Sequence, residues 1–170
     1  MSKIYIINRL KWYYPLERFN AFFFLGVLFY VIYNYGFLNT IFLNYGLLIM
    51  ILILFQGQHY WKLKLYRLTK KEFNQNYKID LFKRFKKINI VLIWYIPITL
   101  LLQLLMNNWT IKPNDLFGWA VIANILGILE HINYYDKQLM IDNIYDWKYL
   151  MRNKKLKIAS LKKDLDENEI

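Results

Sequence analysis

Two apolar segments of the chain are expected to end side by side, and five polar or ionisable side chains are expected to meet at these ends. They include both histidines of the chain. Imidazole and carboxylate groups can hold a metal ion or transfer a proton, and such groups at the edge of an apolar segment often mark functional sites. The predicted polar pocket consists of Gln56, His59, Glu130, His131 and Tyr134.

The spacing of these residues argues against a metal site. Glu130 and His131 are adjacent, so on a helix their side chains diverge by about 100° and match no zinc signature. We therefore predict no metal and no cofactor. The simpler interpretation of Glu130 is an acid that pairs with a nearby Lys or Arg. An enzyme that modifies lipids through Glu130, His131 and His59 stays as a lower-ranked alternative.

A second group of polar residues recurs every four positions on an otherwise apolar segment. It consists of Tyr95, Thr99, Gln103 and Asn107. Such a stripe can cross-link helices, and if copies assemble it can line a shared pore. Within one subunit it has too few polar groups to hydrate a channel.

A third group contains small residues on one helical face: Ala120, Ala123, Asn124 and Gly127. Small side chains allow helices to approach closely in lipid, where a buried amide also needs a hydrogen-bond partner. We predict that this face is a helix-packing seam, with Asn124 bonded to a neighbouring helix.

All these residues lie on or beside four apolar stretches at residues 19–35, 41–55, 88–106 and 116–129. Each approaches the length that crosses a bilayer as a helix. A hydrophobic content of 57% beside a net charge of +11 suits a membrane protein, because charged and apolar residues are segregated along the chain. The predicted fold is an all-α integral membrane four-helix bundle of two helical hairpins, with a kink at Pro97.

The basic residues predict the orientation of the helices. Of the 23 Lys and Arg residues, all but Lys112 lie on what would be one side of the membrane. Positive charge in short loops is retained in the cytoplasm, so both termini and the loop 57–87 are expected there. We expect a bacterial inner membrane. The absence of cysteine excludes disulfides and thiolate metal sites.

Two parts of the chain are expected. Residues 1–135 form the four-span unit with the basic loop 57–87, and residues 136–170 form a cytoplasmic tail of amphipathic helix. Met140, Ile144, Trp147 and Met151 give the tail its apolar face. This face is expected either to pack on the central loop, itself predicted to be helical, or to lie on the membrane surface.

Basic residues beside the spans are expected to contact anionic lipid headgroups. Aromatic residues are interleaved with them, a composition also typical of nucleic-acid binders, but their position next to membrane helices favours lipid. The predicted headgroup contacts are Lys62, Lys64, Arg67, Lys83, Arg84, Lys86 and Lys87.

No Ser-His-Asp arrangement, phosphate-binding loop or HExxH motif is present. The first-ranked function is therefore a non-enzymatic interaction protein, an accessory or regulatory subunit that binds a cytoplasmic protein or another copy of itself. The alternative is an oligomeric effector of stress or defence that changes membrane permeability.

Overall fold

The computed structural model describes residues 3–141 and 143–170. The chain is 78% helical with no strand in the described part, which confirms the all-α prediction. The helices are α1 (Lys3–Tyr35), α2 (Ile41–Leu68), α3 (Gln75–Trp94), α4 (Ile96–Met106), the 3-10 turn η1 (Pro113–Asp115), α5 (Phe117–Tyr135), α6 (Ile144–Asn153) and α7 (Ser160–Asp166).

Four helical segments are long and apolar enough to span a membrane, as predicted. They are Lys3–Tyr35, Ile41–Leu68, Gln75–Met106 and Pro113–Tyr135. The first three extend beyond their apolar stretches at the end that is rich in Lys and Arg. The central loop 57–87 is thus largely helical, formed by the last turns of α2 and the first turns of α3.

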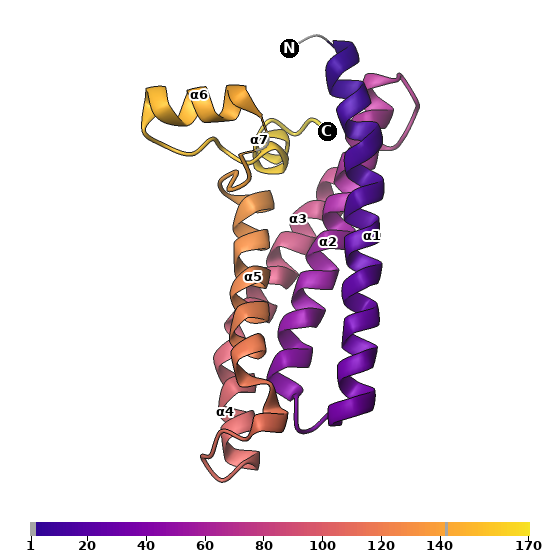
Figure 1. The fold of residues 1–170 in the computed structure, drawn as a ribbon. Helices are drawn as coiled ribbons and strands as arrows, with labels where there is room; N and C mark the ends of the chain where they lie inside the picture. Colours follow the sequence, from indigo (N-terminus) through magenta and orange to yellow (C-terminus); the bar gives the residue numbers. More distant parts are fainter. Residues whose placement is uncertain (1–2, 142) are drawn as a thin grey trace.

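Helix α2 lies between α1 and α5 and contacts both (Figure 1). In its most apolar window 67% of the residues are buried, against 11% for α1 and 11% for the α3–α4 segment. Both termini and the α2–α3 turn lie at one end of the molecule (Figure 1), which we call the basic end. The α1–α2 turn and the α4–α5 connection lie at the opposite end.

Small residues allow α2 and α5 to approach closely. A Cβ atom added at Gly46 would lie 2.7 Å from Asn124 Nδ2. Asn124 Nδ2 donates to the Phe42 carbonyl at 2.9 Å, across the helix interface. The residues of the predicted seam, Ala120, Ala123, Asn124 and Gly127, are all buried.

The third candidate span is broken beside Pro97. Helix α3 ends at Trp94 and α4 begins at Ile96, with Pro97 in its first turn. Proline cannot donate a backbone hydrogen bond and clashes with the preceding turn, so the regular helix stops at Tyr95. The boundary between the two helices thus lies next to Pro97, where a kink is predicted.

The tail forms two helices with different surroundings. Leu161 and Leu165 of α7, together with Ile170, are buried in one apolar cluster with Tyr60 and Phe82. Helix α6 runs crosswise to the long helices and projects from the basic end (Figure 1). The segment between them begins with Lys154 in a left-handed conformation, at φ 51°. The tail therefore packs on the helical ends of α2 and α3 through α7 and not through α6.

Candidate functional site

Tyr134 of the predicted polar pocket bonds to a different part of the protein from Gln56 and His131. Tyr134 Oη donates to Glu17 Oε1 at 2.7 Å, toward α1. His131 instead stacks on Tyr135 at 5.0 Å between ring centroids, and Tyr135 Oη donates to Gln56 Oε1 at 2.8 Å. Successive residues of α5 point in directions about 100° apart, so one pocket cannot collect them all. Tyr134 and His131 thus belong to two different sites.

The first site is a network of amides between α2 and α3. Gln56 Nε2 donates to Asn89 Oδ1 at 2.9 Å, and Asn89 Nδ2 donates back to Gln56 Oε1 at 2.7 Å. Asn89 is 1% exposed and was not among the predicted residues. It lies near the start of the apolar stretch 88–106, next to Lys86 and Lys87, and the sequence does not indicate which helix it faces. This reciprocal pair, with Tyr135, links α2, α3 and α5.

The two histidines lie against aromatic rings. The His59 ring is 5.8 Å from that of Phe82. In the described residues, His59 Nε2 and His131 Nδ1 are buried without a hydrogen-bond partner. Glu130 is hydrogen-bonded to Asn133. No group of three potential metal ligands occurs among the residues that the structure describes.

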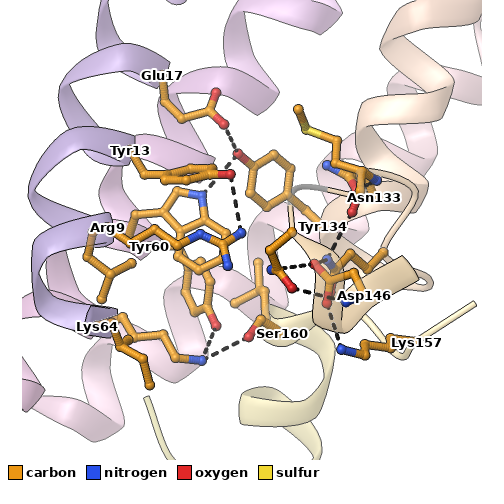
Figure 2. Close-up of a pocket in the computed structure, with 17 residues that line it drawn as sticks. Arg9, Tyr13, Glu17, Tyr60, Lys64, Asn133, Tyr134, Asp146, Lys157 and Ser160 are labelled. Atoms are coloured by element: carbon orange, nitrogen blue, oxygen red, sulfur yellow. Dashed lines mark hydrogen bonds and ion pairs between the residues drawn. The ribbon is translucent and has the colours of Figure 1, made fainter. Parts of the chain in front are cut away.

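The second site is a cavity of about 370 Å³ at the basic end (Figure 2). One face of α1 forms its first wall, with residues at spacings typical of a single helical face. Helices α2 and α5 and the tail form the others. The lining from α1 is Ile6, Arg9, Leu10, Tyr13 and Glu17, and that from α2 and α5 is Tyr60, Trp61, Lys64, Asn133 and Tyr134.

Aromatic rings gather around Trp61 on the wall between α1 and α5. The ring centroid of Trp61 is 4.7 Å from that of Tyr60 and 6.1 Å from that of Tyr13. Its Nε1 donates to Tyr134 Oη at 3.3 Å. The Tyr134 ring lies directly against Gly57, where any added Cβ would overlap the phenol. Gly57 is therefore required for this arrangement.

Lys64 joins the cavity wall to the tail. Its Nζ donates to Asp164 Oδ2 at 2.9 Å, Tyr60 Oη at 2.8 Å and Ser160 Oγ at 3.0 Å. Tyr60 Oη in turn donates to Asp164 Oδ2 at 2.6 Å. All three ammonium protons thus have acceptors within the protein.

Three of the residues predicted to contact headgroups have partners in the tail. Lys64 pairs with Asp164, and Arg67 forms an ion pair with Glu169. Lys83 Nζ donates to Asn168 Oδ1 at 2.8 Å. The acidic end of the tail folds back on these cations, a contact between segments about 100 residues apart that no local pattern indicates.

Asp146 of α6 forms the opposite wall of the cavity (Figure 2). It accepts from Lys157 at 2.6 Å, Asn143 at 2.7 Å and Gln138 at 3.0 Å. Asn143 also caps α6, since its Oδ1 accepts from the Tyr145 and Asp146 amides. These bonds position α6 relative to the segments on either side of it.

The polar stripe on the third span is mostly buried. Thr99, Gln103 and Asn107 are no more than 8% exposed, whereas Tyr95 is 51% exposed. Gln103 accepts from the Phe42 amide at 3.3 Å and donates to the Asn39 carbonyl at 2.7 Å. Asn107 donates to Asp115 at 2.6 Å. Gln103 and Asn107 therefore cross-link the segments at the end opposite the basic end.

Helix α6 presents an apolar stripe to its surroundings. Ile144, Trp147 and Met151 are 64%, 53% and 62% exposed, and their spacing places them on one face. Lys148 and Arg152 on the same helix are also exposed. The sequence predicted this apolar face. Its exposure was not predicted, because it results from the tail packing on the other helices through α7 and leaving α6 uncovered.

The chain matches no known protein family, no curated protein and no solved structure.

Proposed function

We propose that the protein is an integral membrane protein whose four candidate spans cross a bacterial inner membrane as a bundle. The support is the apolar surface that the long helices leave uncovered. Phe22, Phe23 and Phe29 of α1 are 50–63% exposed. Apolar area in water is unfavourable by about 25 cal/mol per Å², so helices with this much uncovered apolar area require lipid around them.

The proposed orientation places the basic end in the cytoplasm. That end carries both termini and the α2–α3 turn, and the sequence places almost all Lys and Arg residues there. Lys112 is the one cation in the connection at the opposite end. Retention of positive loops in the cytoplasm then fixes the direction of every span.

The proposed activity is non-enzymatic: the protein binds a cytoplasmic partner as an accessory or regulatory subunit. The observation that carries this proposal is the exposed stripe of Ile144, Trp147 and Met151 on a helix outside the candidate spans. Apolar anchors at positions i, i+3 and i+7 are the pattern by which a helix docks into a groove of another protein.

The charges beside the stripe suggest the chemistry of that partner. Lys148 and Arg152 flank the apolar anchors, and the whole chain carries a net charge of +11. A second copy would bring like charge to the contact, whereas an apolar groove with an acidic rim would complement it. We therefore favour a different protein over self-association.

The test is the native mass of the gently solubilised protein, with all co-purifying components identified. The wild-type protein is expected to carry one distinct acidic protein at a fixed ratio. Trp147→Glu should abolish this association, since aromatic anchors at interface centres commonly contribute about 2 kcal/mol or more. Tyr77→Glu, which changes an equally exposed aromatic residue on α3, is the matched control and should retain the partner.

A closed homo-oligomer that survives Trp147→Glu would contradict the proposal and favour the permeability effector. Conductance measurements on that oligomer would then be needed. The lipid-modifying alternative predicts instead that Glu130→Ala combined with His59→Ala removes a lipid-converting activity without altering the native mass.

A further inference from the structure

The cavity at the basic end is separate from the proposed partner surface. Its volume of about 370 Å³ lies within the range of small-molecule sites. It separates α1 from the tail, so that a molecule inside would contact both (Figure 2). The α6 stripe residues Ile144, Trp147 and Met151 do not line it.

The charged groups on the cavity wall already have partners inside the protein. Asp146 accepts three hydrogen bonds, and Lys64 donates three. Glu17 accepts from Tyr134, while Arg9 donates to Tyr13 Oη at 3.2 Å and lies 4.9 Å from the centre of its ring. An ionic ligand would lose its hydration here, at a site whose charged side chains are already hydrogen-bonded within the protein.

Apolar groups form much of the remaining wall. Leu10 and Leu161 are buried at its edge, and Ile6 and Met140 face it from α1 and the tail. Lys157 donates to Asp146 and has further ammonium N–H groups that can donate hydrogen bonds to a hydroxyl oxygen. We propose that this cavity binds a neutral amphiphile, with a hydroxyl head near Lys157 and an alkyl body between Ile6, Leu10 and Met140.

Such a ligand would join two parts of the protein. Its alkyl body would bury apolar surface of α1, while its head would contact the segment next to α7. The ligand would bind only when the tail is docked on the helices, because the cavity wall includes the tail. It would therefore stabilise the docked tail by mass action. The site would thereby let a small molecule control how firmly α6 is held.

The test uses the full-length protein in nanodiscs of uncharged lipid and three probes of equal chain length: decanol, decanoate and decylammonium. Thermal unfolding is followed as each probe is added. Decanol is expected to raise Tm saturably by about 5 °C at a hundredfold excess over its Kd. The two charged probes should need concentrations at least about tenfold higher for the same shift.

Variants separate binding in the cavity from partition into lipid. Met140→Trp and Ile6→Trp fill the cavity from opposite walls and should each weaken the decanol response about tenfold or more. Tyr145→Trp places the same side chain at an exposed α6 position outside both the cavity and the α6 stripe and should leave the response unchanged.

Three results would overturn the proposal. The first is an equal response to all three probes, and the second is an unchanged decanol response in both cavity-filling variants. The third is a lack of saturable response to decanol in the wild-type protein. Partner binding measured by native mass is independent of these readouts.

Discussion

At the scale of single residues, two glycines determine how closely α2 and α5 pack. Gly46 faces Asn124, and Gly57 faces the Tyr134 ring. In each case the absence of a side chain leaves room for a hydrogen-bonding group of α5. Close approach of helices in lipid depends on such positions, because van der Waals packing replaces the hydrophobic effect there.

Gly46→Ala should destabilise the protein by about 1–3 kcal/mol, since its Cβ would lie 2.8 Å from the Asn124 backbone nitrogen and the helices would have to separate. Thermal unfolding in mild detergent measures the effect. Gly26→Ala is the control, because no atom lies within 4 Å of its added Cβ. Its effect should be neutral or slightly stabilising, and equal losses in the two variants would contradict the close contact.

Asn89→Leu tests the buried amide pair. Removing Asn89 leaves the Gln56 side-chain amide without its acceptor, which should cost about 1–3 kcal/mol in unfolding free energy. In the double variant Gln56→Leu with Asn89→Leu no unpaired amide remains, so its loss should be smaller than the sum of the two single losses. Additive losses in a detergent unfolding series would show that the two amides do not interact.

At the scale of elements, the tail is attached through α7 while α6 stays uncovered. Leu161 and Leu165 bury against the ends of α2 and α3, and the Lys64–Asp164 pair lies beside them. Helix α6 is held through Asp146 and its hydrogen bonds to Asn143, Gln138 and Lys157. The two tail helices can therefore serve separate purposes, attachment and recognition.

Asp164→Ala should loosen the tail by about 2 kcal/mol, because it leaves the partly exposed Lys64 ammonium without its carboxylate. Limited proteolysis is the measurement, with faster cleavage expected between α5 and α7. Asp166→Ala alters an exposed acid of the same helix and should leave the cleavage rate unchanged. If both variants were cut at the wild-type rate, the Lys64–Asp164 pair would not hold the tail.

At the scale of the whole molecule, the distribution of charge and the positions of the helix ends both support the proposed orientation. The connections at the end opposite the basic end are short. The basic end, in contrast, carries the helical extensions, the tail and the cavity. Under the proposed topology, nearly all of the structure outside the bilayer is cytoplasmic.

Single cysteines can test this topology directly, because the chain contains none. Leu38→Cys and Ile111→Cys, at exposed positions of the end opposite the basic end, should react with a membrane-impermeant maleimide in intact cells. Asn76→Cys at the basic end should react only after permeabilisation. Labelling of Asn76→Cys in intact cells would reverse the proposed orientation. Exchange of Lys83, Arg84, Lys86 and Lys87 for Glu should then weaken the orientation preference.

Local patterns in the sequence predict the all-α class, the four candidate spans and an irregularity of the helix at Pro97. Each depends on local patterns, namely the length of apolar runs and the missing donor of proline. The small-residue face of α5 was also readable from spacing alone, since its members share one side of a helix.

Tertiary packing selects which polar groups meet. It separated Tyr134 from His131, paired Gln56 with Asn89, and brought the acidic tail to Lys64 and Arg67. Helical periodicity gives the direction of a side chain on its own helix but not the helix that it will face. Contacts between distant segments arise only when the whole chain packs, and the cavity is made of such contacts.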